Sequence, residues 1–274
     1  MKLKTLAYRL LTAVVAIPLV LGIFWVAKRY GMDWLVGVLM ATVGVIAAGE
    51  YLYLVGRLGI PLPRELLLGA TPGFLMLAVL WEGRYALVVG WAAAYMIVVY
   101  SFFRQGPREG FFASLAGIFG FLYIPGLLSF VYLIHRGGFW YLVQFFLIVW
   151  GYDTGAYLVG SLIGRHQLLP RISLSKTWEG VAGGLAFSVL GAAVCVPFWD
   201  DFLRWLPHVL ALGVWVGSFV QLGDLFESLL KRAAGVKDAG RLLPGHGGIL
   251  DRIDGLLAAL PIYFFYMHFV LGLI

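Results

Sequence analysis

The sequence predicts an all-α integral membrane protein with about nine transmembrane helices and a cytoplasmic N-terminus. Three observations support this fold class: the composition, a series of long apolar runs, and the placement of the basic residues. Hydrophobic residues make up 62% of the 274-residue chain and charged residues only 12%, and the mean hydropathy is +0.92. Soluble domains are about half apolar and about a quarter charged. A water-soluble fold could not bury this much apolar surface, so the expected solvent is lipid.

Each predicted helix is an apolar run long enough to cross a bilayer, which takes roughly 17 to 25 residues at about 1.5 Å each. The first run follows a basic start without a small-residue cleavage site, so we predict a retained helix rather than a signal peptide. The third and fourth runs are separated only by Glu82, Gly83 and Arg84. In chain order the runs are 10–27, 34–55, 65–82, 85–103, 111–134, 139–163, 180–198, 206–230 and 255–274.

The orientation follows from the basic residues of the loops, which concentrate on the cytoplasmic side. The loops on the side opposite the N-terminus hold only Lys28, Arg29, Arg84, Arg136 and Arg204 of the twenty lysines and arginines. With an odd number of helices, the bias places the N-terminus inside and the C-terminus outside. The net charge of +6 is therefore attributed to topology, and no nucleic-acid partner is expected.

The polar residues divide the chain into two regions. Residues 1–110 are predicted to form an apolar N-terminal membrane scaffold with few polar residues at membrane depth. Residues 111–274 are predicted to form a C-terminal membrane domain that carries a site on the cytoplasmic face. Its acidic residues between 150 and 254 are Asp153, Glu179, Asp224, Glu227, Asp238, Asp251 and Asp254.

One face of the eighth predicted helix carries four polar residues at spacing i, i+3, i+4 and i+7. A Glu–Lys pair in a solvated last turn explains Glu227 and Lys231. It does not explain Asp224, because a lone carboxylate deeper in an apolar helix costs about 3 kcal/mol and needs a cation. The four residues are Asp224, Glu227, Ser228 and Lys231.

The loop that follows is rich in glycine, with Gly235, Gly240, Gly245, Gly247 and Gly248. Glycines allow close backbone approach, and backbone amides that lead into a helix N-terminus bind anions. Basic residues lie in and beside the same loop, which further supports the prediction that it binds phosphate. They are Lys237, Arg241 and Arg252.

Asp251 and Asp254 are three residues apart at the start of the ninth predicted helix. Helix capping would explain one of them. Both acids together with Asp224 fit a magnesium site better, since Mg²⁺ prefers oxygen ligands and is held by one or two carboxylates plus substrate phosphates. His246 is interpreted as a phosphate or loop contact, because magnesium disfavours imidazole.

Two upstream segments add polar residues. Asp153 lies within the sixth apolar run, where it needs a partner or has a structural hydrogen bond. The segment 173–180 combines Ser173, Lys176, Thr177 and Glu179 just before the seventh helix. Taken alone, this segment is equally explained as a cytoplasmic loop in which Thr177 caps the helix.

Together these residues resemble the phosphatidate cytidylyltransferase (CDP-diacylglycerol synthase) family. The upstream part of the resemblance is the Asp-Thr-Gly-Ala-Tyr run at 153–157 and the Lys-Thr-Trp-Glu-Gly run at 176–180. The remainder is a signature that the chain matches without a gap, at Ser228, Lys231, Arg232, Lys237, Asp238, Gly240, Leu243, Pro244, His246, Gly247, Gly248, Asp251, Arg252 and Asp254.

The resemblance implies transfer of cytidylyl from CTP to phosphatidic acid, which gives CDP-diacylglycerol and pyrophosphate by metal-assisted in-line attack on the CTP α-phosphorus. It implies Mg²⁺, a second cation such as K⁺, a homodimer, and a multi-pass protein of the inner (plasma) membrane. We expect Asp224, Asp251 and Asp254 as metal ligands. The expected catalytic residues are Asp224, Lys231, Asp251 and Lys237, and the expected substrate-binding residues are Ser173, Lys176, Thr177, Ser228, Arg232, His246, Gly247, Gly248 and Arg252.

Two alternatives stay open. Intramembrane acids and glycine-broken helices also mark secondary transporters, although those usually place their sites near the bilayer midplane. A cytidylyltransferase that acts on a different lipid acceptor fits the same residues, because acceptor specificity would lie in apolar helix surfaces.

Overall fold

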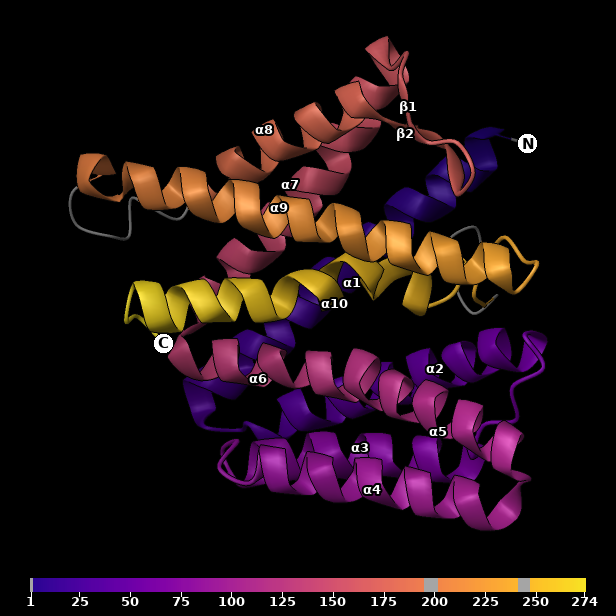
Figure 1. Ribbon diagram of the computed structural model, residues 1–274. Helices are drawn as coiled ribbons and strands as arrows, with labels where there is room; N and C mark the ends of the chain where they lie inside the picture. The colour runs from indigo at the N-terminus through magenta and orange to yellow at the C-terminus, as the bar shows by residue number, and fades with distance from the viewer. Residues whose placement is uncertain (1, 195–201, 241–246) are drawn as a thin grey trace. The chain divides into compact units, whose positions relative to one another are not determined.

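The computed structural model describes residues 2–194, 202–240 and 247–274. These residues form helices almost throughout, with one small antiparallel sheet (Figure 1). The elements are α1 (Lys2–Tyr30), α2 (Trp34–Arg57), α3 (Arg64–Leu80), α4 (Ala86–Arg104), α5 (Pro107–Phe121), the π-helical turn η1 (Leu122–Gly126), α6 (Leu127–Gly137), α7 (Phe139–Ile163), β1 (Gln167–Leu169), β2 (Ser173–Thr177), α8 (Trp178–Val194), α9 (Phe202–Ala233), α10 (Leu250–Phe265) and the π-helical turn η3 (Tyr266–Val270).

The predicted apolar runs all overlap helices, which confirms a helical, multi-pass membrane protein. Within the described residues, six helical stretches are long and apolar enough to cross a membrane. The runs 65–82 and 180–198 fall on α3 and α8, which have 17 residues each. The count of nine spans and the side of the N-terminus stay predictions. The six stretches are Trp34–Arg57, Ala86–Arg104, Pro107–Gly137, Phe139–Ile163, Trp205–Ala233 and Leu250–Val270.

The hairpin of β1 and β2 departs locally from the all-α prediction. The two strands pair antiparallel, with Gln167 opposite Thr177 and Leu169 opposite Ser173. The segment falls between two apolar runs, so its backbone groups must be satisfied outside a transmembrane helix. A short strand pair satisfies them and gives the segment 173–177 a defined backbone.

The chain forms two compact units, each described here by itself. The first comprises residues 1–133 and 230–253, and the second comprises residues 134–229 and 254–274. The division into an N-terminal scaffold (1–110) and a C-terminal domain that carries the site (111–274) stays a prediction.

In the first unit, α2 packs on α3 and α4 packs on α5. Tyr51 of α2 is 3% exposed, and its hydroxyl donates to the carbonyl oxygen of Ala116 at 2.8 Å. Gly120 makes room for this ring, since a Cβ there would overlap it. Phe74 of α3 meets Phe121 edge to face, with ring centroids 5.2 Å apart. These contacts tie three helices of this unit together.

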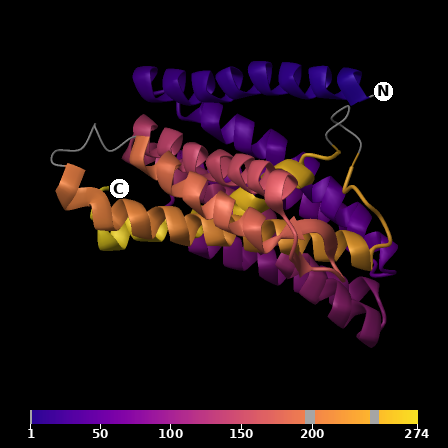
Figure 2. The ribbon, with the colours of Figure 1, turned by 90° about the horizontal axis from the view of Figure 1, so that it is seen from above.

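In the second unit, α7 and α8 lie side by side with their backbones in close approach (Figure 2). A Cβ on Gly155 would stand 2.5 Å from the carbonyl oxygen of Gly183. Further along, a Cβ on Gly151 would stand 2.8 Å from the carbonyl oxygen of Phe187. Small residues at such an interface let membrane helices pack without a hydrophobic driving force between them.

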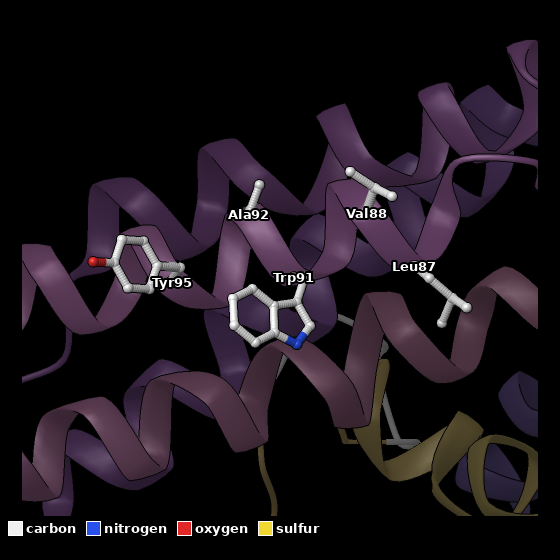
Figure 3. A pocket seen from close by; sticks show the side chains of 5 residues that line it. All are labelled: Leu87, Val88, Trp91, Ala92 and Tyr95. Carbon is white, nitrogen blue, oxygen red and sulfur yellow. The ribbon is translucent and has the colours of Figure 1, made fainter.

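One face of α4 is apolar and uncovered. Leu87 is 90% exposed and Trp91 77% exposed. Figure 3 shows these side chains with those of Val88, Ala92 and Tyr95, which together line an open hollow on this helix. An apolar surface of this kind is expected of a helix that faces lipid.

We predict that Gly155→Ala destabilises the protein, because the added methyl group meets backbone that cannot rotate away. Overpacking of this kind costs about 1–3 kcal/mol. The measurement is the Tm in detergent. Gly73→Ala is the matched control, because a Cβ at that helical position meets nothing within 4 Å. An equal Tm for the two variants would contradict the close approach of α7 and α8.

Candidate functional site

Lys176 and Asp224 form an ion pair in the second unit. Strand β2 presents Lys176, whose Nζ lies 2.8 Å from Oδ1 of Asp224 on α9. The same Nζ donates to Oγ of Ser228, one turn further along α9, at 3.4 Å. The lysine side chain is 15% exposed and the aspartate side chain 43% exposed. The pair supplies the cation that Asp224 was predicted to need, and it leaves the carboxylate accessible to a ligand.

Three helices of this unit bring carboxyl groups into the surroundings of Asp254. The charges of Asp224, Glu227 and Asp153 all act on the carboxyl group of Asp254. Asp153 belongs to α7 and Asp254 to α10, while Glu227 on α9 is fully buried. Like charges gathered at membrane depth are stabilised by cations. Oxygen ligands of this kind suit a hard divalent ion such as Mg²⁺.

Asp251 is held on both of its oxygens in the first unit. Its Oδ1 lies 2.6 Å from Nζ of Lys231, and the two side chains are 5% and 14% exposed. Its Oδ2 accepts the amide N–H of Gly248 at 2.8 Å and that of Ala239 at 2.9 Å. Gly247 has a φ of +80°, and a Cβ there would stand 2.7 Å from the same Oδ2. Glycine at 247 is therefore required twice, for its backbone conformation and for its lack of a side chain.

Glu50 of α2 joins this cluster, and sequence reasoning did not select it. Its carboxylate accepts the amide N–H of Ile249 at 3.0 Å and that of Leu250 at 2.7 Å, at the start of α10. The side chain is 9% exposed. The signal that was available is a lone glutamate inside the apolar run 34–55, where a carboxylate needs a partner.

Glu179 fastens the base of the hairpin. Its carboxylate accepts the amide N–H of Arg165 at 3.1 Å and that of His166 at 3.2 Å. The His166 ring Nδ1 lies 2.5 Å from the other carboxylate oxygen, and the Trp178 amide donates to the His166 carbonyl oxygen. The hydrogen bonds of Glu179 thus join the end of α7 to the start of α8, on either side of the hairpin that carries Lys176.

The remaining predicted residues fall in three groups. Thr177 accepts the Gly180 amide on its Oγ1 at 3.1 Å, so the capping interpretation of Thr177 is confirmed. Ser173 on β2 lies 3.2 Å from Ser175, measured between hydroxyl oxygens. His246 lies outside the described residues. Three of the predicted basic residues, Arg232, Lys237 and Arg252, are exposed.

The structure therefore groups the predicted residues as Lys176, Asp224 and Ser228 in one unit. Lys231, Gly248 and Asp251 group in the other. Among the side chains that the structure describes, no three His, Cys, Asp or Glu residues gather closely enough to enclose a metal ion. The metal site with Asp224, Asp251 and Asp254 stays a prediction.

We predict an acid-sensitive contribution to stability from Glu179, which lies outside the six membrane-crossing stretches. The hydrogen bond from His166, helped by backbone amides, lowers the pKa of Glu179 from 4.5 to about 2. Because this pKa is depressed in the folded state, its stabilisation is present above about pH 4.5 and is lost as the pH falls toward 2. The measurement is the Tm in detergent as a function of pH for the wild type and Glu179→Gln. Between about pH 4.5 and 2 the Tm of Glu179→Gln should fall less than that of the wild type.

The control for that experiment is Glu65→Gln, which removes a carboxyl group from the first turn of α3. Its acid profile should follow that of the wild type. Coincident profiles for Glu179→Gln and wild type would show that the Glu179 contacts do not stabilise the fold.

The Cytidylyltransferase family model matches residues 7–270. A phosphatidate cytidylyltransferase of Haemophilus influenzae is 42% identical over 137 residues, which cover 49% of this chain and 48% of that protein. One of Staphylococcus saprophyticus is 40% identical over 172 residues, covering 62% and 65%. The chain thus spans about half to two thirds of the length of these relatives. Because the family match extends over nearly all of the sequence, the chain belongs to the cytidylyltransferase family.

Proposed function

We propose that the protein transfers cytidylyl from CTP to phosphatidic acid, giving CDP-diacylglycerol and pyrophosphate for phospholipid biosynthesis. The observation that carries the proposal is the ion pair between Lys176 of β2 and Asp224 of α9, among further carboxylates, in a membrane protein of the cytidylyltransferase family. The similar bacterial proteins are named phosphatidate cytidylyltransferases, and that name gives the two substrates.

The reaction joins two anions, so charge neutralisation and alignment are its main requirements. An oxygen of the lipid phosphate attacks the α-phosphorus of CTP in line, and the bond from that phosphorus to the pyrophosphate oxygen breaks. The lipid phosphate is already ionised at neutral pH, so no strong base is needed. Lys176, Lys231 and Lys237 would donate to phosphate oxygens, with the glycine-loop amides of Gly247 and Gly248 as further donors.

Each of the three proposed metal ligands fits a divalent cation differently. Asp224 is partly exposed, and Lys176 lies beside one of its oxygens. Asp254 lies where the charges of three other carboxylates act on it, so a cation there would relieve repulsion. Asp251 already binds Lys231 and two amides, and its share in a metal site would use its remaining lone pairs. Bound Mg²⁺ would neutralise phosphate charge; a second cation such as K⁺ rests on the family resemblance.

The proposed function also predicts the location and the oligomeric state of the protein. We place the protein in the inner (plasma) membrane with this site toward the cytoplasm, where soluble CTP can meet a lipid headgroup. We further propose a homodimer, as the family resemblance implies. Cross-linking in native membranes tests it, and a monomer alone would overturn it.

The central experiment supplies purified protein in detergent with labelled CTP, phosphatidic acid and Mg²⁺ and follows pyrophosphate release. The wild type should release pyrophosphate in step with CDP-lipid formation. Asp224→Asn and Asp251→Asn should each lower kcat by at least about 100-fold, the scale of losing one electrostatic group in a catalytic site. Both variants should stay folded by gel filtration.

The matched control is Asp33→Asn, an equivalent change in the turn before α2, on the side predicted to face away from the cytoplasm. It should keep wild-type turnover. Near-normal activity in either Asp224→Asn or Asp251→Asn would overturn the corresponding assignment.

A panel of acceptors separates the two alternatives. Phosphatidic acid should support turnover, and a polyprenyl phosphate should not; the opposite preference would identify a different lipid acceptor. If neither lipid supports pyrophosphate release, the proposed enzymatic function is wrong. The protein would then be reconstituted in vesicles and tested for substrate uptake, as the transporter alternative requires.

A further inference from the structure

We infer that Glu50 of α2 is a positioning residue for the reaction, because its carboxylate completes the N-terminus of α10 and thereby fixes Asp251. The inference rests on the proposed function for its catalytic consequence, but not for its structural part. Nothing in the motif region of the chain would reveal the role, since Glu50 lies 200 residues before Leu250, whose amide it binds.

α10 begins at Leu250, so Ile249 is its N-cap residue. A typical N-cap residue is Ser, Thr, Asp or Asn, whose side-chain oxygen accepts an amide of the first turn. The isoleucine side chain has no such acceptor. Asp251 accepts the amide of Gly248, one residue before the N-cap.

Glu50 supplies acceptors at the start of α10 from another helix. Its two carboxylate oxygens accept the amides of Ile249 and Leu250 separately. The negative charge also lies at the positive end of the helix dipole of α10. These amide donors are thus satisfied by a carboxylate that reaches them only while α2 and residues 249–250 stay in contact within this unit.

The surrounding glycines fit this arrangement. A Cβ on Gly248 would stand 2.5 Å from each carboxylate oxygen of Glu50, and a Cβ on Gly240 would overlap the same carboxylate. Side chains at both positions would expel Glu50 from the helix start. These two glycines of the predicted phosphate loop therefore have a packing reason of their own, which is to admit the carboxylate of α2.

Asp251 is the residue through which Glu50 acts. The amide of Gly248 binds Asp251, while the next two amides along the chain bind Glu50. A shift of the 248–250 backbone would move the donor to Oδ2 of Asp251. It would also alter the direction in which Oδ1 faces Lys231. Supporting groups of this kind change activity by about 10- to 100-fold without touching substrate.

The experiment compares Glu50→Gln, Glu50→Ala and the control Glu65→Gln, an exposed glutamate of α3. The first readout is hydrogen exchange of a peptide that contains residues 249–251. Exchange should be at least tenfold faster in Glu50→Ala than in wild type. It should be intermediate in Glu50→Gln, which keeps one carbonyl oxygen as an acceptor, and unchanged in Glu65→Gln.

The second readout is turnover of CTP by the same folded preparations. Glu50→Ala should lower kcat by about 10- to 100-fold with a smaller change in the KM for CTP, and Glu50→Gln should recover part of it. Faster exchange with wild-type kcat would overturn the positioning role, and wild-type exchange in Glu50→Ala would overturn the contact itself. If Glu50→Ala does not fold, the isosteric Glu50→Gln carries both readouts.

The two proposals fail separately. A wild-type protein without turnover would sink the proposed function. The exchange data would still decide whether Glu50 fixes the start of α10 and Asp251.

Discussion

The carboxylates of Asp224, Asp251 and Glu50 are each matched by a positive group or by hydrogen-bond donors, and that constraint organises the polar residues around them. Charge without a partner at membrane depth costs about 3 kcal/mol or more. Asp224 meets the constraint with Lys176. Asp251 meets it with Lys231 and two amides, and Glu50 meets it with the first amides of α10. The partners come from a strand, a helix end and a loop, so satisfying the charges also fixes these segments.

Glycine makes those matches sterically available. Where α7 meets α8, Gly155 and Gly183 let the backbones approach, and this packing lies directly before and after the hairpin that presents Lys176. In the other unit, Gly247 and Gly248 leave the space that the carboxylates of Asp251 and Glu50 occupy. In both places the absence of a side chain is what allows a charged group or a helix to reach its partner.

The sequence predicted the helices well because lipid imposes one length and one polarity on every span. It also selected Asp224 and Asp251, because acids in or beside apolar runs are costly. It could not predict which lysine binds which acid, since Lys176 reaches Asp224 only through the fold of the hairpin. Glu50 carried the same signal, a carboxylate inside an apolar run, but its partners could not be predicted because they are backbone amides. For Asp251 the capping interpretation is realised in its bond to Gly248, while its part in a metal site stays a prediction.

The lysine pairs also explain why a cation requirement is expected of the proposed reaction. Lys176 pairs with Asp224, and Lys231 pairs with Asp251. Phosphate oxygens of CTP would compete with these aspartates for the same ammonium groups. A lysine that turns toward a phosphate leaves its carboxylate without a counter-charge, and in the second unit further acids act on the same region. Under the proposed function, we expect a positive ion to replace the charge of that lysine, because the carboxylate oxygens left behind are hard ligands that a divalent cation prefers. We therefore expect substrate binding and cation binding to be cooperative, because CTP draws the lysine charge away from the carboxylates and the cation restores positive charge beside them.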